Sequence, residues 1–369
     1  MGLKINIAVN LLNYFSAPTG GEEHLIKNLI RGFELYKPSN IEFFYLITKP
    51  AFPKFKKHLK NKQVKIIDVN HDRISLRLIW QILNLKKIIP DSADILFTPQ
   101  FILPRKLNNV KTVSIFHDSQ YKDIPENFSF LERCYYDFIN YRTIKNSDYI
   151  ITISQFSKKK IKKHFNLDGS IKVIYNPIRI DTNIKNSEEK KILKKYNLKK
   201  NKYYYTISTN YKHKNLITMI DLFSKKIKEN FVLTGSKRDS TEIFQRKKTE
   251  NIKITGYIKE KEKNVLLKNC KLFLFPSVYE GFGMPVVEAL SYGKKVITTK
   301  ESSIKEVSIN KAIYVNNPFD VEEWENKISE TKKGSLKLNS RTQKIFRDKY
   351  GIKNITKKYL KVFEDIYSN

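Results

Sequence analysis

The clearest fold signal in this sequence is the stretch Leu272-Phe-Leu-Phe-Pro-Ser-Val-Tyr-Glu280-Gly-Phe-Gly-Met-Pro285-Val-Val-Glu288-Ala-Leu-Ser-Tyr-Gly293. Its first four residues form a continuous apolar run, which predicts a strand covered on both faces. A turn with two glycines follows. Pro285 is typical of the first position of a helix, where a missing N–H costs nothing. The stretch therefore predicts a buried strand, a glycine turn and a helix.

The same stretch predicts a ligand site. The free N–H groups of Gly283 and Met284, together with the positive end of the helix dipole, would form an anion site. We expect Glu280 on the loop and Glu288 in the first helical turn, so that both carboxylates flank one ligand and accept hydrogen bonds from its hydroxyls. The alternative is that Glu288 only favours the helix N-terminus and that the glycines only shape a turn.

Short apolar runs recur along the chain and alternate with longer stretches of helical period, which indicates parallel βαβ units. In the first half the predicted strands are residues 5–9, 43–47, 64–67, 95–98, 112–116 and 149–153, with helices at 22–36, 76–89 and 130–145. In the second half the predicted strands are residues 203–208, 231–234, 252–255, 272–275, 295–298 and 312–315. The pattern breaks at Tyr175-Asn-Pro177, and we interpret the polar residues 181–201 as an interdomain linker.

With 369 residues, the chain is longer than one hydrophobic core usually serves. We predict an α/β protein of two doubly wound, Rossmann-like domains, residues 1–178 and 179–350, facing each other across a cleft. Ligands of such domains bind at the carboxyl ends of the strands. Residues 351–369 have the period of a final helix.

The sequence Glu280-Gly-Phe-Gly-Met-Pro-Val-Val-Glu288 resembles the Glu-x7-Glu signature of retaining glycosyltransferase family 4. The resemblance extends over nearly the whole chain. It includes Thr255-Gly-Tyr-Ile258, Gly293-Lys-Lys-Val-Ile297, Glu301-Ser-Ser-Ile-Lys-Glu306, Ile153-Ser-Gln-Phe-Ser157 and Lys172-Val-Ile-Tyr-Asn-Pro177. It implies the two-domain GT-B fold, with the last helix folded back on the first domain. It also implies a hexosyltransferase that uses a nucleotide-sugar donor and a glycan or polyprenyl-linked acceptor in bacterial surface polysaccharide synthesis, such as lipopolysaccharide or capsule.

The resemblance implies a role for each motif residue of the second domain. Glu280 would bind hydroxyls of the donor sugar, and Glu288 the ribose of the nucleotide. Lys214, in Lys212-His-Lys-Asn-Leu216, would neutralise the diphosphate. The residues expected along the rest of the donor are Phe282, Gly283 and Met284 at the sugar or diphosphate, and Tyr257 and Ile258 at the base.

In the first domain the resemblance places His117 beside the donor sugar, without making it a catalytic base, because the leaving phosphate is thought to deprotonate the acceptor. The loop Pro18-Thr-Gly20-Gly21-Glu22 opens a helix after the first strand. Its glycines would let the main chain approach the donor phosphates, although a plain tight turn is the alternative.

The predicted diphosphate site lacks two features: an Arg upstream of Lys214 and an Asp-x-Asp metal motif. Ser208-Thr-Asn210 stands where many relatives have an Arg, and Lys212, Lys237 or Arg238 are candidates to replace it. No Asp-x-Asp motif follows a predicted strand. We therefore expect no cofactor and no required metal, with Lys214 and the helix N-termini taking the metal's place.

The formal net charge of +33 comes from 59 Lys and 11 Arg against 37 acidic residues. Recognition of bases and phosphates favours Arg, so the large excess of Lys over Arg argues against a nucleic-acid partner. It indicates either the codon bias of an AT-rich genome or attraction to an anionic membrane surface. For a membrane, residues 54–65 and 158–163 are the candidate patches, and solvated helix faces are the alternative.

Two cysteines, Cys134 and Cys270, and the lack of an apolar signal or spanning segment favour a cytoplasmic protein, or one peripheral to the inner membrane face. The sequence leaves the oligomeric state open. A sugar-nucleotide epimerase or phosphorylase with the same fold is the alternative enzyme, and a basic nucleic-acid-binding protein is the alternative from another class. A phosphorylase would need a pyridoxal lysine. A nucleic-acid-binding protein would show steep salt dependence with phosphate-rich ligands.

Overall fold

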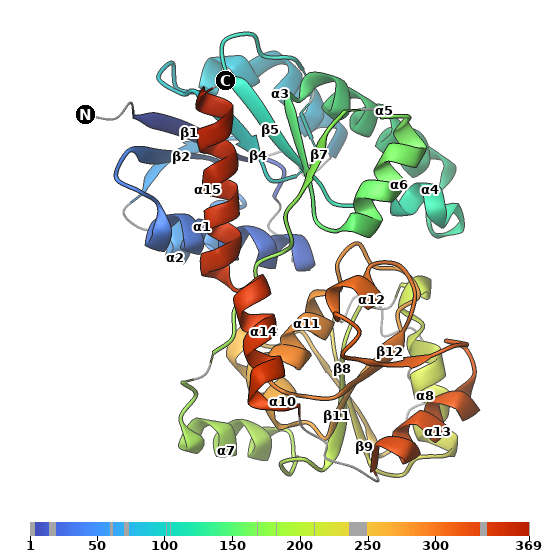
Figure 1. Ribbon diagram of the computed structural model, residues 1–369. Helices are drawn as coiled ribbons and strands as arrows, with labels where there is room; N and C mark the ends of the chain where they lie inside the picture. The colour runs from blue at the N-terminus through green and yellow to red at the C-terminus, as the bar shows by residue number, and fades with distance from the viewer. Residues whose placement is uncertain are drawn as a thin grey trace. The chain divides into compact units, whose positions relative to one another are not determined.

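The computed structural model describes residues 4–14, 20–59, 62–69, 74–100, 102–103, 105–167, 169–181, 183–209, 211–235, 249–332 and 338–368. The chain divides into two compact units (Figure 1). The first comprises Met1–Pro177 together with Ile352–Asn369, and the second comprises Ile178–Gly351. The C-terminal segment therefore belongs to the first unit.

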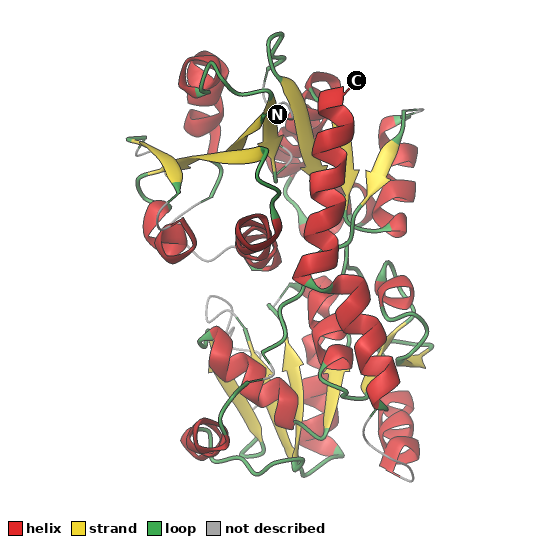
Figure 2. Cartoon of the chain, turned by 60° about the vertical axis from the view of Figure 1, so that its left-hand side comes forward, coloured by secondary structure: helices red, strands yellow, loops and turns green. Residues whose placement is uncertain are grey.

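The first unit contains a seven-stranded parallel sheet in the order β3-β2-β1-β4-β5-β6-β7. Its strands are β1 (Ile5–Leu11), β2 (Ile41–Thr48), β3 (Gln63–Ile67), β4 (Ile95–Thr98), β5 (Lys111–Phe116), β6 (Tyr149–Thr152) and β7 (Ile171–Val173). Its helices are α1 (Gly21–Tyr36), α2 (Phe52–Leu59), α3 (Ile74–Ile88), α4 (Gln120–Asp123), α5 (Phe130–Asn146), α6 (Gln155–Phe165) and α15 (Ile352–Ser368), with a 3₁₀ turn at Pro125–Asn127. Helices separate consecutive strands of this unit (Figure 2), except that β5 follows β4 with no helix among the described residues between them.

Both faces of this sheet are buried, as the continuous apolar runs predict. On one face Ala8, Leu46 and Leu96 of three neighbouring strands pack against Leu85 and Ile88 of α3. On the other face Phe33 of α1 stacks on Phe43 of β2, with ring centroids 4.4 Å apart, and the rings of Phe97, Tyr359 and Phe363 complete an aromatic cluster.

Helix α15 packs against α1 of the first unit. Gly32 allows the close approach, because a Cβ built on it would lie 1.9 Å from Oγ1 of Thr356. The Thr356 side chain is fully buried, and its hydroxyl has no hydrogen-bond partner among the described residues. The absence of a side chain at residue 32 thus sets the distance between the two helices.

Gly32→Ala is expected to lower the free energy of unfolding by about 1–3 kcal/mol, because the new methyl group overpacks the contact between α1 and α15. Chemical denaturation of the purified variant measures this. In the matched control, Gly32→Ala with Thr356→Ala, the hydroxyl that meets the methyl group is gone, and most of the stability should return. A single variant as stable as the parent would show that α15 does not need the close approach.

The second unit contains a six-stranded parallel sheet in the order β10-β9-β8-β11-β12-β13. Its strands are β8 (Tyr203–Ile207), β9 (Asn230–Thr234), β10 (Ile252–Gly256), β11 (Leu272–Phe275), β12 (Val296–Thr299) and β13 (Ile313–Val315). Its helices are α7 (Asn186–Lys195), α8 (Leu216–Lys225), α10 (Glu260–Asn269), α11 (Met284–Ser291), α12 (Ile304–Val307), α13 (Val321–Lys332) and α14 (Ser340–Tyr350), with a 3₁₀ turn at Lys212–Lys214. Trp324 of α13 and Phe223 of α8 belong to its main core.

The interpretation of residues 181–201 as a linker is wrong. They contain helix α7, which packs on α10 inside the second unit. Leu193 and Glu189 are the buried residues of this helix, and the Glu189 carboxylate pairs with Lys268 of α10. The segment looks like a linker in the sequence because only a narrow stripe of it is apolar. Its burial depends on a partner 79 residues further along the chain.

Candidate functional site

The order of the six-stranded sheet reverses between β8 and β11. In open α/β sheets the ligand crevice lies outside the carboxyl ends of the strands at such a switch point. The loop after β8 carries His213 and Lys214, and the loop after β11 carries Ser277 and Glu280. The switch point of the second unit thus brings together two sequence motifs that are separated by more than sixty residues.

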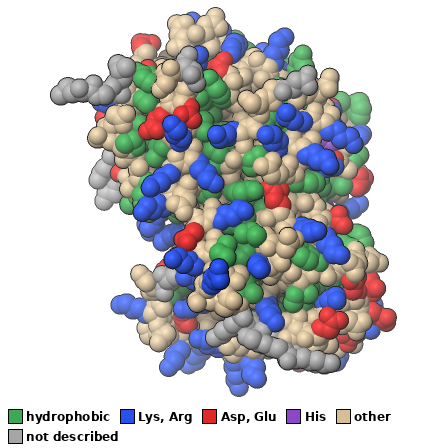
Figure 3. All heavy atoms as spheres, viewed as in Figure 1, with side chains coloured by type: hydrophobic (Ala, Val, Ile, Leu, Met, Phe, Trp, Pro, Cys, Tyr) green, Lys and Arg blue, Asp and Glu red, His purple; other side chains and the backbone are tan. Residues whose placement is uncertain are grey.

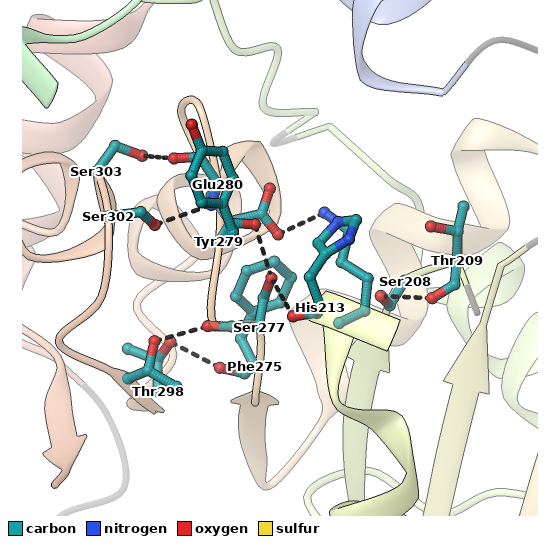
Figure 4. A network of polar contacts seen from close by, with 12 residues as sticks. Ser208, Thr209, His213, Phe275, Ser277, Tyr279, Glu280, Thr298, Ser302 and Ser303 are labelled. Carbon is teal, nitrogen blue, oxygen red and sulfur yellow. Dashed lines mark hydrogen bonds and ion pairs between the residues drawn. The ribbon is translucent and has the colours of Figure 1, made fainter. Parts of the chain in front are cut away.

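Lys214 and Glu280 form an ion pair at this point, with 2.7 Å between Nζ and Oε1 (Figure 4). Their side chains are 18% and 12% exposed, so the pair is shielded from bulk water. Two serines that directly precede α12 hold the main chain of Glu280. Its N–H donates to Oγ of Ser302 at 2.8 Å, and its carbonyl accepts from Oγ of Ser303 at 2.8 Å. The carboxylate and the ammonium group are therefore both fixed before any ligand binds.

His213 joins the two loops through its main chain. Its carbonyl accepts from the N–H of Val278 at 2.8 Å and from Oγ of Ser277 at 3.3 Å. Its ring stacks on Tyr211, with centroids 5.7 Å apart. Burial, with a contribution from the Lys214 charge, lowers the pKa of His213 to about 3. The ring is therefore neutral at physiological pH, and it adds no charge beside Lys214.

Gly283 immediately precedes helix α11 and has a left-handed conformation, with φ 79° and ψ 50°. A Cβ at this position would lie 3.3 Å from the Cδ1 of Ile304, so both backbone and space favour glycine. The helix starts at Met284, which makes Pro285 the second helical residue rather than the first. Phe282 and Met284 are both buried, so neither side chain is open to solvent at the start of the helix.

The predicted place of Glu288 in the first turn of the helix is wrong. Glu288 is the fifth residue of α11 and lies in its second turn. Both carboxylate oxygens accept from Nζ of Lys263 on α10, at 2.8 and 3.0 Å, and the two side chains are only 8% and 12% exposed. Sequence reasoning missed Lys263, because nothing distinguishes it from the other lysines in Glu260–Asn269.

Tyr257 and Ile258 follow β10, the edge strand of the same sheet. The Tyr257 side chain is 51% exposed, and Ile258 is partly buried. An exposed aromatic ring beside an aliphatic side chain suits the stacking of a flat heterocycle. Both residues lie at the carboxyl edge that carries Lys214 and Glu280.

The first unit has its own switch point, between β1 and β4. His117 follows β5 and is buried, and its Nε2 lies 3.0 Å from the carbonyl oxygen of Pro99, which follows β4. A carbonyl only accepts, so Nε2 carries the proton and, in the neutral ring, Nδ1 is the acceptor. The structure therefore fixes the tautomer and the orientation of the ring.

Gly20 precedes α1 with φ 72°, and Gly21 is the first residue of the helix. Among the described residues, no heavy atom lies within 4 Å of a Cβ built on either glycine. Pro18 and Thr19 of the predicted loop lie outside the described residues. Glu22, in the same turn, accepts from Nε2 of Gln100 at 3.1 Å, a contact that sequence reasoning did not predict.

Lys212, one of the candidates to replace the missing Arg, is exposed in the 3₁₀ turn before Lys214. The other two, Lys237 and Arg238, lie outside the described residues. The described part of Ser208-Thr-Asn210 contributes a hydrogen bond from Oγ of Ser208 to the carbonyl of Thr209 at 3.0 Å. Within the residues that the structure covers, no group of three His, Cys, Asp or Glu side chains is placed to hold a metal ion.

Two family models match the chain. The model described as Glycosyltransferase Family 4 matches residues 19–182, and the one described as Glycosyl transferases group 1 matches residues 188–348. Among curated proteins, the O-antigen chain mannosyltransferase RfbU of Salmonella typhimurium is 25% identical over 240 residues, which are 63% of each chain. The O-antigen chain mannosyltransferase B of Escherichia coli is 25% identical over 237 residues, which are 61% of each chain. The matched stretch spans less than two thirds of the length of these relatives.

A solved structure of a glycosyltransferase from Rickettsia africae superimposes with a TM-score of 0.74 over 99% of both chains, at 17% sequence identity. The likeness confirms the predicted GT-B fold, with two parallel-sheet α/β domains of seven and six strands. At this level of identity it carries information on the fold alone.

Proposed function

Because the chain belongs to the glycosyltransferases that the group 1 and family 4 models describe, we propose that it transfers a sugar from a nucleotide diphosphate sugar to a glycan or lipid-linked acceptor, with retention of the anomeric configuration. The observation that supports this best is the shielded pair of Lys214 and Glu280 at the switch point of the second unit. Such a pair offers a cation to the diphosphate and an acceptor to sugar hydroxyls within one site.

The charges of this pair match the charges that develop during transfer. As the glycosidic bond breaks, negative charge builds on the leaving diphosphate, and the ammonium of Lys214 can neutralise it. Fixed groups do this efficiently, because they need no reorganisation at the moment of reaction. The amide groups at the start of α11, after Gly283, add the positive end of a helix dipole.

We propose mannose as the sugar, carried by GDP, with a UDP-sugar as the alternative donor. The support for mannose is that two relatives are O-antigen chain mannosyltransferases. Tyr257 and Ile258 would border the base, and Glu288 would bind the ribose. In the first unit, His117 and the main chain of Gly20 and Gly21 are the residues proposed for the donor sugar and phosphates.

For the chemistry we propose a front-face reaction without a metal ion. The acceptor hydroxyl attacks the anomeric carbon on the same face from which the leaving group departs. An oxygen of the leaving phosphate takes the hydroxyl proton. No protein side chain has to serve as the base in this scheme. The buried, neutral ring of His213 is consistent with a positioning rather than a proton-transferring role.

The test is a thermal-shift panel of GDP, UDP and dTDP followed by a transfer assay with the sugar donor of the best-binding nucleotide. Stabilisation should grow with the logarithm of nucleotide concentration over its dissociation constant. NMR of the product should show the donor's anomeric configuration, and turnover should persist in EDTA. No stabilisation by any nucleotide would contradict the donor site. An inverted product would contradict the front-face scheme. Loss of activity in EDTA that magnesium or manganese restores would contradict metal independence.

A further inference from the structure

Helix α5 exposes an apolar stripe. The side chains of Phe130, Leu131, Phe138 and Tyr141 are exposed, and Leu131 is 78% exposed. Cys134, also exposed, lies between them on the same side of the helix. From Leu131 onward, exposed residues recur three and four positions apart, which places them along one face of a helix. The face opposite is the one that Ile139 and Thr143 bury against the domain.

Helix α3 has a stripe of the same kind. Leu76, Ile79 and Leu83 are exposed, with Leu83 62% exposed, while Leu78 and Leu85 on the other side are buried in the core. A helix on the surface of a globular protein usually has one apolar face, which it buries. Here two helices each have a second apolar face in solvent.

The two helices lie on the same face of the seven-stranded sheet and flank one loop. Right-handed crossovers place α3 and α5 on the face opposite α1 and α2 (Figure 1). Two described residues of the loop after β4 contact these helices: the N–H of Leu103 donates to Oγ1 of Thr143 on α5 at 3.0 Å, and Arg105 donates to the carbonyl of Ile82 on α3 at 3.2 Å. The two stripes therefore belong to one surface, which we call the α3–α5 surface.

The charges around the α3–α5 surface are mainly positive. The exposed residues that end the two stripes are Lys86 and Lys87 on α3 and Lys145 on α5. The guanidinium groups of Arg133 and Arg142 lie over the rings of Phe130 and Phe138, 5.8 and 5.5 Å from their centroids.

The acidic residues of α5 are occupied within the domain. Glu132 accepts hydrogen bonds from the N–H and the hydroxyl of Ser129, at 2.7 and 2.8 Å. Asp137 accepts from the hydroxyl of Tyr121 at 2.9 Å and pairs with Lys122. Helix α3 contains no acidic residue.

We propose that the α3–α5 surface docks the protein on a membrane that contains anionic lipids, with the two apolar stripes inserted at the level of the headgroups and the cations paired with lipid phosphates. Amphipathic helices lie on membranes in this way. A second copy of the chain is disfavoured as the occupant, because a symmetric contact would bring the same cations together. None of the described helices has the length and apolar character needed to cross a bilayer.

This surface differs from the lysine-rich patches that the sequence suggested. Lys54 pairs with Glu23 at 2.9 Å, and Lys62 pairs with Glu34. Lys160 of α6 pairs with Asp123 at 2.6 Å. Three of these cations are therefore already matched by acids. On the face that Figure 3 shows, Lys and Arg side chains are spread among apolar and acidic ones.

The chain contains a natural probe for this docking. Cys134 is exposed in the α5 stripe, whereas Cys270, the only other cysteine, is fully buried, and burial raises the pKa of its thiol to about 12. A polarity-sensitive maleimide dye should therefore label Cys134 selectively. With phosphatidylglycerol vesicles, and without donor or acceptor, the dye emission should shift to the blue. Phosphatidylcholine vesicles should give no shift, and added salt should weaken the effect.

Cosedimentation with variants tests the surface itself. Leu83→Gln combined with Leu131→Gln should lower the partition into phosphatidylglycerol vesicles at least about tenfold, since each withdrawn leucine loses part of its apolar burial and about 1.4 kcal/mol is tenfold. The matched control is Phe319→Gln, which removes an exposed apolar residue of the second unit and should bind like the parent. Lys159→Gln with Lys163→Gln on α6 should also bind like the parent.

Three results would overturn the proposal. The first is no blue shift with anionic vesicles, and the second is equal partition of the leucine variant and the parent into them. The third is no vesicle binding together with a parent protein that is dimeric in light scattering and a leucine variant that is monomeric. The last result would assign the surface to a second copy of the chain. Because vesicle binding needs no sugar donor, its failure leaves the proposed transfer reaction untouched. A failure of transfer would likewise leave the docking surface untouched.

Discussion

Glu280→Ala should lower the rate of sugar transfer by about 10²–10³-fold, the range expected when one fixed polar group is removed from around a transition state. The loop carboxylate contributes to the site through its bond to Lys214, and the main chain that positions it is held independently by Ser302 and Ser303. The fold should therefore survive the change. Initial rates with saturating donor, beside a thermal melt of the same preparation, measure both effects.

The matched control for this variant is Glu301→Ala, which removes an exposed acid that follows β12 and changes the net charge by the same amount. It should transfer at nearly the parent rate. Glu280→Gln is a second comparison: it keeps a hydrogen-bond acceptor for sugar hydroxyls but loses the charge that holds Lys214. Near-parental turnover of a well-folded Glu280→Ala protein would remove Glu280 from the reaction, and equal losses in the Glu280 and Glu301 variants would indicate an effect of net charge.

Most of the fold could be predicted from the sequence, because buried parallel strands are continuous apolar runs. The strands at 95–98 and 272–275 coincide with β4 and β11, and the other ten predicted runs differ from their strands by at most two residues at either end. Strand β7 was not among the predicted runs, because it has only three residues and one of them is the exposed Lys172. Helix α7 was missed because its ten residues include four lysines and two glutamates.

The position of Lys214 and Glu280 after neighbouring strands of the second sheet could be predicted, because residue type and strand position agree for both. What the sequence did not predict is how these side chains are paired before a ligand binds. Lys263 and Glu288 lie 25 residues apart on different helices, and only the packing of α10 and α11 at the sheet brings them together. Pairing of this kind depends on the tertiary structure, and a chain with 59 lysines offers too many possible partners.

The pairing of Glu288 makes its substitution a second strong test. Glu288→Gln should lower the free energy of unfolding by about 3–5 kcal/mol, because it leaves the ammonium of Lys263 buried without a counter-charge. It should also weaken nucleoside diphosphate binding, if the remaining acceptor positions of the carboxylate bind ribose hydroxyls. A carboxylate has about four lone-pair sites, and Lys263 occupies one on each oxygen. Urea denaturation and calorimetric titration measure the two effects.

The double variant Lys263→Met with Glu288→Gln separates stability from ligand binding. With both charges removed, no unpaired charge is buried, and much of the lost stability should return. Nucleotide binding should stay about 10- to 100-fold weaker than in the parent, since a hydrogen bond to a charged group is worth about 1.5–3 kcal/mol and about 1.4 kcal/mol is tenfold. The single variant Lys263→Met, which retains the carboxylate, should bind more tightly than the double variant once both are compared at a temperature where they are folded. If the double variant instead regained the parental dissociation constant along with its stability, Glu288 would be only the structural partner of Lys263, and the ribose would have to be bound by other residues.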